Sequence, residues 1–408
     1  MGAPAARASE LARHWIAANH DVTVLTGFPN HPTGKVPPEY RSKLRRLITT
    51  ERFEGAKVVR SWLLPFPNRR AYERMLNYSS FCLSAASTGM FLERPDVLIA
   101  SSPQLLVALA GWWLARWKKT KFVFEVRDLW PESLAAVGMG GTNSPLHRSL
   151  AHIAGFLYRK ADRIVVVTPA FEQYLVDRWK VPREKISVVE NGVETDLFSP
   201  RHNEPLRHEL NAHGRFIVSY IGTMGMAQGL DTLIEAAARL QNVAPEVLFL
   251  LIGEGADRGR IQNLATTRRL TNIRFVDQQP RAKIPALISA SDASLVLLKK
   301  ADLFKTVIPT KMLEFMSCAC PLILGVEGQA RDIMEQAQAG VAIEPENPEE
   351  LVDAVIRLAK DRALREELGN NGRRYILQHF SRERKAFHYI EILQSMMSEG
   401  RLRQAAAA

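Results

Sequence analysis

Short apolar runs and helical patterns alternate along the first half of the chain. The apolar runs are rich in β-branched residues and cover residues 21–27, 57–64, 96–102, 121–126 and 163–168. Stretches with helical spacing lie between most of them, at residues 5–18, 77–91, 103–116 and 145–159. Strands that are apolar on both faces and alternate with helices predict a parallel sheet covered by helices on both sides.

A second series of the same kind follows an irregular link at residues 186–200. Its apolar runs cover residues 216–222, 247–253, 273–277, 293–298 and 321–325, with helices expected at 230–241 and 283–289. A helical tail extends from residue 348 to about residue 403. The pattern predicts an α/β protein of two Rossmann-like, doubly wound domains that face a central cleft.

Two segments interrupt this regularity. Residues 30–77 are rich in Pro and Arg with little periodicity, which is typical of a long, partly irregular excursion that carries function. Residues 104–117 form the most apolar stretch, but its length of 14 is below the roughly 20 residues that cross a bilayer. We expect a buried or interfacial helix there. The first residues lack the pattern of a secretory signal.

Composition and charge narrow the function classes. An apolar share of 46% and a charged share of 24% are ordinary for a globular protein. The three cysteines, Cys82, Cys318 and Cys320, form neither a disulfide framework nor a zinc spacing, which indicates a reducing compartment. Residues 1–190 hold 27 basic against 16 acidic side chains, so the whole net charge of +11 lies there. This half therefore suits an anionic partner, or carries a diffuse solubility charge.

The glycine-rich turn at residues 219–237 is the first candidate binding site. It joins a strand to a helix through Gly222, Gly225 and Gly229, and such loops let backbone amides approach a phosphate. The spacing matches neither G-x-G-x-x-G nor the Walker pattern, so a tight structural turn is an equal alternative.

A second candidate lies on the helix expected within residues 308–321. Lys311 and Glu314 are three residues apart and share a helix face, which suits the phosphate and hydroxyl groups of a ligand. An exposed ion pair is the alternative.

Polar side chains also follow two strands of the first half. Glu125, Arg127, Asp128 and Glu132 surround the end of the run at 121–126 and form either a binding site or a local salt-bridge network. His31 lies in a Pro/Gly loop, where a histidine is more often an exposed residue without a function than a catalytic one.

Seven segments taken together resemble a known family. They are TGFPNHPTG, RMLNYSSF, FVFEVRDLWPES, VVTPAF, VENGVETDLFSP, SYIGTMGMAQGLDTLIEAA and IPTKMLEFMSCACP. In this order they resemble the GT-B glycosyltransferases of family 4, in particular bacterial transferases of capsule, colanic-acid-like and O-antigen synthesis (the fucosamine-transferase-like branch). The resemblance spans residues 2 to 395.

The resemblance implies a division of labour. Residues 1–190 would bind the acceptor, residues 191–378 the nucleotide-sugar donor, and a helix at 379–408 would cross back to the first domain. The donor diphosphate would meet the loop through Gly222, Met224, Gly225, Gln228 and Gly229. Lys311 would add charge there and Glu314 would bond the ribose. Transfer would be retaining, from a UDP-sugar, with no cofactor and no metal. Asp128, Arg127 and His31 are the candidates on the acceptor side.

The chain departs from the family pattern at three places. Thr306 stands where the first Glu of Glu-x7-Glu is expected, and Gln228 stands where the donor loop commonly has Lys. The diphosphate charge would then come from Lys311, Arg258 or Lys305. The sequence also opens within the first loop, at Gly2-Ala3-Pro4. We expect a longer form, with about a dozen apolar residues upstream as a central strand, to be the functional one.

The family's acceptors are saccharides on polyprenyl diphosphate, which gives the basic first half an anionic membrane surface as partner. We expect a cytoplasmic protein, peripheral on the inner face of the membrane. Basic side chains are interleaved with aromatic ones in the excursion, which suits a membrane surface. The alternative is a solvated basic loop. The basic residues are Arg41, Lys43, Arg45, Arg46, Arg69, Arg70 and Arg74, and the aromatic ones are Trp62, Phe66 and Tyr72.

The alternative function is a basic nucleotide- or nucleic-acid-binding Rossmann protein without transferase activity. The sequence pI of about 9.6 is compatible with it. No recognised nucleic-acid motif occurs in the sequence, and the glycines and acidic ribose partner of an NAD site are out of register. We therefore expect no nucleic-acid partner.

Overall fold

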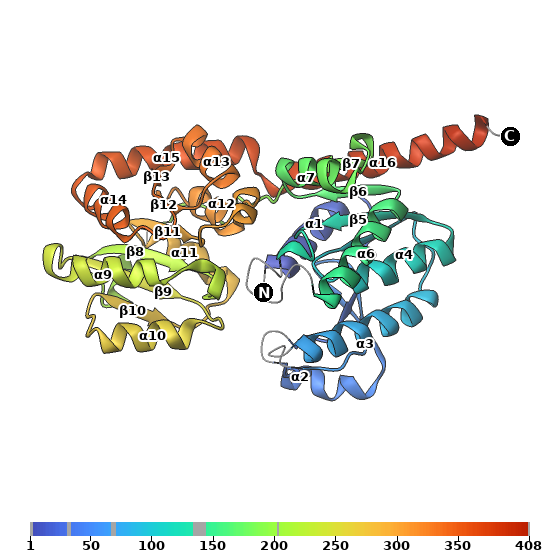
Figure 1. The fold of residues 1–408 in the computed structure, drawn as a ribbon, viewed down its shortest axis with the longest axis horizontal. Coiled ribbons are helices and arrows are strands. Elements are labelled where there is room, and N and C mark those ends of the chain that lie inside the picture. The colour runs from blue at the N-terminus through green and yellow to red at the C-terminus, as the bar shows by residue number, and fades with distance from the viewer. Residues whose placement is uncertain (1–2, 31–33, 67–70, 134–143, 202–203, 407–408) are drawn as a thin grey trace. The chain divides into compact units, whose positions relative to one another are not determined.

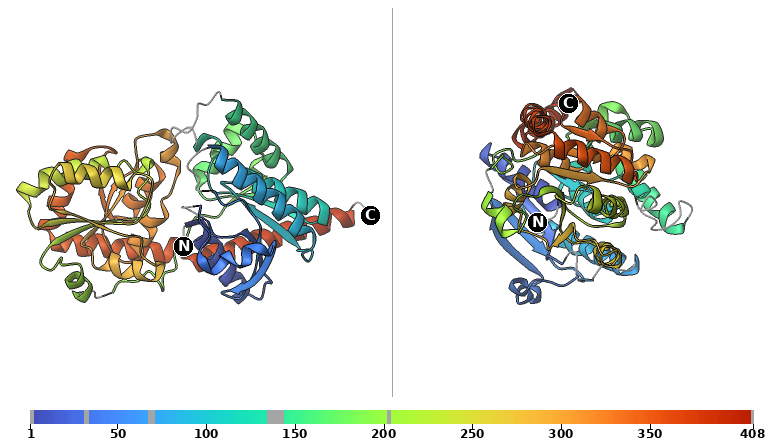
Figure 2. Two further views of the ribbon diagram at one scale, coloured as in Figure 1. Left: turned by 90° about the horizontal axis from the view of Figure 1, so that it is seen from below. Right: turned by 90° about the vertical axis from the view of Figure 1, so that its left-hand side faces the viewer.

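The computed structural model of the protein describes residues 3–30, 34–66, 71–133, 144–201 and 204–406. It divides into two compact units (Figures 1 and 2). The N-terminal unit consists of Pro4–Glu190 together with the C-terminal residues from Ala386 on, and the C-terminal unit contains Asn191–Lys385. We describe each unit by itself.

One parallel sheet of six strands organises the C-terminal unit, in the order β10-β9-β8-β11-β12-β13. Its strands are β8 (Phe216–Ile221), β9 (Val247–Ile252), β10 (Ile273–Val276), β11 (Ala293–Leu297), β12 (Leu322–Gly325) and β13 (Gly340–Ala342). Counted within the unit, the order is 3-2-1-4-5-6, that of a dinucleotide-binding sheet. The predicted doubly wound domain is confirmed.

Helices cover both faces of this sheet because its strands are apolar on both sides (Figure 1). Ile217, Leu248 and Leu324 point to one hydrophobic cluster, whereas Val218, Phe249 and Leu295 point to another. The first cluster includes residues of α11 (Ile284–Ser289), α12 (Thr310–Ser317), α13 (Gln329–Ala337) and α15 (Arg362–His379), and the second includes residues of α9 (Asp231–Val243), α10 (Arg258–Thr267) and α14 (Pro348–Lys360). The short helix α8 (Glu204–Glu209) precedes β8.

The N-terminal unit contains two sheets. One has the order β1-β3-β2, with β1 (Thr23–Gly27) parallel and β2 (Ile48–Phe53) antiparallel to β3 (Ala56–Ser61). The other is parallel, in the order β4-β5-β6-β7, with β4 (Val97–Ser101), β5 (Lys121–Val126), β6 (Arg163–Val166) and β7 (Ile186–Val188). The predicted α/β character of this half is confirmed, and within the described residues its strands are divided between these two sheets.

The helices of this unit confirm the predicted helical stretches within a few residues. They are α1 (Ala3–Ala17), α2 (Pro38–Arg41), α3 (Ala71–Met90), α4 (Leu105–Lys118), α6 (Pro145–Lys160), α7 (Pro169–Trp179) and the long C-terminal helix α16 (Arg382–Ala406). None of the helices in the described part of the chain combines the length and the apolar character that a membrane crossing requires.

The predicted excursion is more regular than the sequence indicates. Strands β2 and β3 form a hairpin through Glu54 and Gly55, which both have positive φ, as a two-residue hairpin turn requires. Arg60 donates a hydrogen bond of 2.7 Å from Nε to Glu51 and packs over the ring of Tyr40. Sequence patterning missed this hairpin because β2 is mostly exposed and the turn lacks the usual Asn-Gly signal.

A buried ion pair stabilises the end of β5. Glu125 accepts hydrogen bonds from Arg7 Nε at 3.1 Å, Arg7 NH2 at 3.0 Å and Ser101 Oγ at 2.7 Å. Arg7 also donates to the carbonyls of Val189 and Glu190. Burial alone would raise the pKa of Glu125, but Arg7, Arg127 and Ser101 together bring it below its usual value. Arg7 thus ties helix α1 to the end of β5 and to the segment that follows β7.

Removing one charge of this pair leaves the other buried without compensation. We expect Glu125→Gln to lower the free energy of unfolding by about 3–5 kcal/mol at neutral pH. Lys121→Gln is the control, because Lys121 forms an exposed ion pair with Asp162 and should cost roughly 0–1 kcal/mol. Urea denaturation measures both. Equal destabilisation by the two variants would contradict a structural role for the Arg7–Glu125 pair.

Candidate functional site

The strand order of the C-terminal unit places a binding position at the carboxyl ends of β8 and β11. Helical connections leave these neighbouring strands in opposite directions, which opens a crevice between the following loops. After β8 the chain turns at Gly222 (φ 150°), passes through the 3-10 turn Met226–Gln228 and reaches α9 through Gly229 (φ 57°). The predicted glycine loop therefore lies at the switch point.

The loop after β9 packs tightly against this glycine loop. A Cβ on Gly253 would overlap the carbonyl of Gly222, and a Cβ on Gly255 would overlap the carbonyl of Met224. The amide of Met224 donates to Glu254 O at 2.9 Å. These two glycines are required for the close approach, which depends on a tertiary contact and could not be predicted from the sequence.

The remaining predicted loop residues have structural contacts. The Met224 side chain is fully buried in the core, so only its backbone belongs to the loop surface. Gln228 Oε1 accepts a hydrogen bond of 3.0 Å from the amide of Gly225 and closes the loop on itself. The Lys299 amide donates to Ala227 O at 2.9 Å, which fixes the loop against the segment that follows β11.

Lys311 contacts this loop at Gly222. Its Nζ lies 4.0 Å from the ring centroid of Tyr220 and would lie 3.7 Å from a Cβ on Gly222. Within the described chain, no carboxylate forms an ion pair with it. The side chain is half-buried, and removal from water lowers the pKa of Lys311 to about 7. An unpaired cation beside backbone amides suits an anionic group.

Glu314 does not pair with Lys311, so the alternative of an exposed Lys–Glu pair is wrong. Its Oε1 accepts a hydrogen bond of 2.8 Å from Arg281, and both side chains are mostly buried. Arg281 also packs over the ring of Phe198, with Cζ 4.9 Å from the centroid. Arg281 could not be predicted from the sequence, because it comes from the distant turn before α11.

The two other candidate cations are already paired with carboxylates. Arg258 forms ion pairs with Glu254 and, at 2.6 Å, with Asp277. Lys305 is exposed and lies 2.9 Å from Asp302 Oδ1. Lys311 is therefore the candidate cation whose charge has no counterion of its own.

In the N-terminal unit, the end of β5 brings Arg127 and Asp128 over the end of β4. The hydroxyl of Ser102 accepts hydrogen bonds from the amides of Arg127 (2.8 Å) and Asp128 (3.2 Å). These two hydrogen bonds hold Arg127 and Asp128 at the carboxyl edge of the parallel sheet. Arg127 also contributes to the low pKa of the buried Glu125.

The Asp128 carboxylate accepts no hydrogen bond from the residues described. Burial raises its pKa from the ordinary 3.8 to about 6, and the nearby Arg127 opposes that rise. A carboxylate of this kind can exchange a proton near neutral pH.

Glu125 and Glu132 have other partners. Glu125 pairs with Arg7, and Glu132 accepts a hydrogen bond of 2.6 Å from the Tyr174 hydroxyl. The salt-bridge alternative therefore holds for Glu125. His31 lies outside the described residues.

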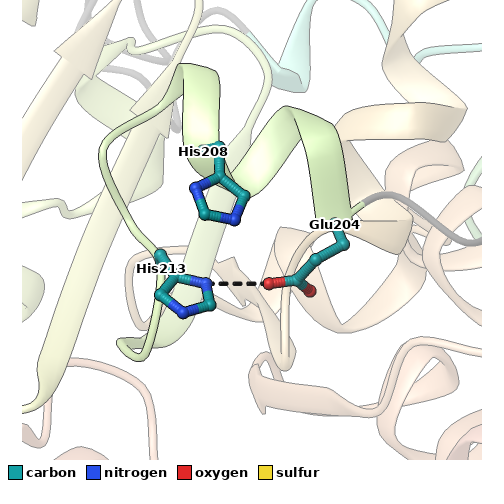
Figure 3. A group of neighbouring side chains, drawn as sticks. All are labelled: Glu204, His208 and His213. Atoms are coloured by element: carbon teal, nitrogen blue, oxygen red, sulfur yellow. Dashed lines mark hydrogen bonds and ion pairs between the residues drawn. The ribbon is translucent and has the colours of Figure 1, made fainter.

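One group of side chains could hold a metal ion (Figure 3). Glu204 and His208 come from α8, and His213 comes from the turn before β8; their ligand atoms lie within 4.8 Å of one another. His213 Nδ1 is 3.0 Å from Glu204 Oε1, and the two imidazole rings stack at 4.4 Å. Nitrogen and oxygen ligands of this kind suit zinc. The group precedes β8, at the opposite end of that strand from the glycine loop.

Comparisons with known proteins agree with this architecture. Residues 2–192 match the family model described as glycosyl transferase 4-like domain, and residues 203–375 match the model described as glycosyl transferases group 1. A protein of Escherichia coli (strain K12) named for colanic acid biosynthesis, the glycosyl transferase WcaI, is 26% identical over 371 residues, which are 84% of this chain and 85% of WcaI. WbjE of Pseudomonas aeruginosa, named as a glycosyltransferase, is 24% identical over 76% of this chain and 74% of its own.

Solved structures share the fold. Sucrose-phosphate synthase from Thermosynechococcus elongatus superposes with a TM-score of 0.74 at 20% identity, over 96% of this chain and 92% of that one. Anabaena HepE in complex with UDP gives a TM-score of 0.67 at 15% identity, over 92% and 100%.

Two Rossmann-like α/β units with a glycine loop at a switch point define a protein of the GT-B class. The two family models together cover nearly the whole chain. The chain therefore belongs to the group 1 glycosyltransferases and has a glycosyl transferase 4-like domain at its N-terminus. This membership decides against the alternative of a basic binding protein without transferase activity.

The close approach at Gly253 yields a prediction with an internal control. Gly253→Ala places a methyl group against the Gly222 carbonyl at φ 140°, so we expect destabilisation by about 2–4 kcal/mol. Gly259→Ala, at an exposed position of helix α10 where an added Cβ meets open space, should be neutral or stabilise by up to about 1 kcal/mol. Thermal unfolding of both variants provides the comparison. A harmless Gly253→Ala would show that the two loops do not approach as closely as described.

Proposed function

We propose that this glycosyltransferase moves a sugar, with retention of anomeric configuration, from a nucleotide-sugar to a lipid-linked saccharide in bacterial surface polysaccharide synthesis. The observation that carries the donor site is Lys311, an unpaired, half-buried cation beside Gly222 at the switch point. UDP is the proposed nucleotide, supported by the UDP bound to the structural neighbour HepE. The polysaccharide context is supported by the name of WcaI.

The donor diphosphate would lie against the amides of the loop from Gly222 to Gly229. The bond between the sugar and the diphosphate breaks as negative charge grows on the leaving phosphate, so fixed donors aimed at that phosphate lower the barrier. Lys311 supplies the charge, and the loop amides supply hydrogen bonds. Glu314, oriented by Arg281, would accept hydrogen bonds from the ribose hydroxyls.

We propose that the transferred sugar is a hexose and that its transfer needs no metal ion. The protonated Lys311 and the loop amides neutralise the diphosphate in the role that a divalent cation has elsewhere. Arg258 and Lys305, which already pair with carboxylates, would respond to donor binding only by exchanging those partners.

On the acceptor side, the reacting hydroxyl must lose a proton as its oxygen bonds to the sugar. Asp128 is the proposed recipient of a hydrogen bond from that hydroxyl, because its carboxylate is unpartnered among the described residues and titrates near neutral pH. Arg127 would hold an anionic part of the acceptor, such as its diphosphate. The basic side chains of the excursion, with Arg41, Arg45 and Arg46 exposed, would attract the anionic inner face of the membrane.

A prediction for the donor site concerns the pH dependence of UDP binding. Since the pKa of Lys311 is about 7, its charge is lost as pH rises, and UDP affinity should fall about tenfold between pH 7 and 8.5. Lys311→Met should abolish this pH dependence and weaken UDP binding, whereas the exposed, paired Lys300→Met should leave both unchanged. Calorimetric titration with UDP is the measurement.

The same titration with GDP and NAD tests the choice of nucleotide. Glu314→Gln should weaken nucleotide binding at every pH without altering its pH dependence. A cooperatively folded protein that binds no nucleoside diphosphate would overturn the proposed function.

A prediction for Asp128 separates its effect on stability from its effect on activity. In the folded chain this carboxylate titrates near pH 6 but in the unfolded chain near 4, so its ionisation lowers stability as pH rises between these values. Asp128→Asn should therefore raise the free energy of unfolding at pH 7 by about 1–2 kcal/mol and have no effect below pH 4. Sugar transfer should nevertheless fall by about 100-fold or more. A variant that is stabilised but transfers normally would remove Asp128 from the proposed mechanism.

A further inference from the structure

Glu204, His208 and His213 form a group of metal-ligating side chains that the proposed transfer reaction does not use (Figure 3). We call these three residues the α8 triad. Glu204 and His208 are four residues apart on α8 and therefore share one side of the helix. All three residues come from the short segment 204–213, so little chain entropy is lost in bringing them together.

The way in which α8 ends fixes the backbone of this group. Asn211 has a φ of 46°, and its amide donates to His208 O at 2.8 Å. The next amide, of Ala212, donates to Arg207 O at 2.8 Å. These are the two hydrogen bonds of a Schellman motif, which ends a helix in a tight turn. The turn places the His213 ring on the His208 ring, with centroids 4.4 Å apart.

Contacts with the sheet hold α8 and the turn in place. Arg207 donates to Ala290 O at 3.1 Å and to Asp292 Oδ2 at 3.0 Å. Asp292 in turn accepts a hydrogen bond of 2.8 Å from the amide of Ile217 in β8. Ala212 is fully buried. The two histidines thus directly follow residues that are anchored in the fold, while their own side chains are exposed. Such support is what a metal site requires.

The contact between His213 and Glu204 does not account for the whole group. It joins Nδ1 to Oε1 at 3.0 Å, and the two side chains are 65% and 46% exposed, so this pair contributes little to stability. The His208 ring forms no hydrogen bond within the part of the chain that the structure describes. A second imidazole adds nothing to the pair, whereas it completes a set of three nitrogen and oxygen ligands.

We infer that the α8 triad binds one zinc ion. Three protein ligands leave one position of a tetrahedral zinc ion open, and water would take it because both histidines are exposed. Ligand atoms about 2.1 Å from such an ion lie about 3.4 Å from one another. Since the three ligand atoms already lie within 4.8 Å, they would close by at most about 1.4 Å. The rings would also turn out of their stack, so that a nitrogen of each faces the ion.

The zinc ion would stabilise the fold and take no part in sugar transfer. A helix of six residues is too short to be stable by itself, and the ion would fasten α8 to the turn before β8. The α8 triad precedes β8 and the glycine loop follows it, and a strand of six residues spans roughly 20 Å. The inference is therefore independent of the proposed donor site and compatible with a transfer that needs no metal.

The test is a calorimetric titration of the full, metal-free chain with zinc chloride. One zinc ion should bind per chain, and His208→Gln, His213→Gln and Glu204→Gln should each weaken its affinity at least about tenfold. His388→Gln is the matched control, because His388 also forms an exposed pair with a carboxylate, at 3.4 Å from Glu391. Among the described residues that pair belongs to no group of three ligands, so its loss should leave zinc binding unchanged.

Two further measurements identify the cause of any loss of binding. Since both histidines are exposed, the double variant His208→Gln with His213→Gln should unfold like the parent chain in EDTA, which excludes misfolding as the cause. Cobalt(II) in place of zinc should give the visible absorption of a tetrahedral ion in the parent chain but not in the double variant. Magnesium, which prefers six oxygen ligands, should not compete with zinc.

Two results would overturn the inference. The folded parent chain could bind no zinc, or the double variant could bind zinc as tightly as the parent chain, which would place the ion elsewhere. UDP titration of the parent chain with zinc and with EDTA keeps the two proposals separate. Equal UDP affinity in the two titrations is expected, and a dependence on zinc would contradict a purely structural ion.

Discussion

The C-terminal unit depends on the backbone contact between the loops that follow β8 and β9. Gly222 lies directly under Gly253, and Met224 under Gly255, at distances that no side chain could share. This contact lets two parallel strands end at the same level, with their loops turned toward the switch point. The amide-rich loop, the position of Lys311 and the entry into α9 all follow from it. A binding site built in this way uses backbone groups, whose placement is fixed by the sheet rather than by flexible side chains.

Charge is distributed differently in the two units. In the C-terminal unit, most arginines near the loop are neutralised by carboxylates, for example Arg258 by Glu254 and Asp277, while Lys311 is left against the ring of Tyr220. In the N-terminal unit, Glu125 is buried with Arg7, and the Asp128 carboxylate accepts no hydrogen bond from the described residues although Arg127 is near. Lys311 and Asp128 are thus two titratable groups whose charged forms are disfavoured by burial. Such groups are where a ligand gains most, because it removes an existing electrostatic cost.

Much of this arrangement could be predicted from the sequence. Apolar runs rich in β-branched residues indicated the parallel strands, and glycine spacing indicated the loop at Gly222–Gly229. The partners could not be predicted, because Arg281 meets Glu314 and Arg7 meets Glu125 only through the tertiary fold. The hairpin β2–β3 was missed because its outer strand is mostly exposed and its residues, ITTERF, do not alternate between apolar and polar. Periodicity records which side of an element is buried, and it contains no information on which distant side chain arrives there.

The departures of this chain from its family pattern form a consistent set. Where a lysine is common in the donor loop, Gln228 uses its side-chain oxygen to hold the Gly225 amide, so the loop is closed by a neutral hydrogen bond. Lys311, half-buried beside Gly222 and Tyr220, has a pKa of about 7 because it is removed from water. If the diphosphate binds here as proposed, the electrostatic contribution to binding is concentrated in Lys311. The site would then bind an anion strongly only where Lys311 carries its proton, so donor affinity and pH are coupled through one side chain.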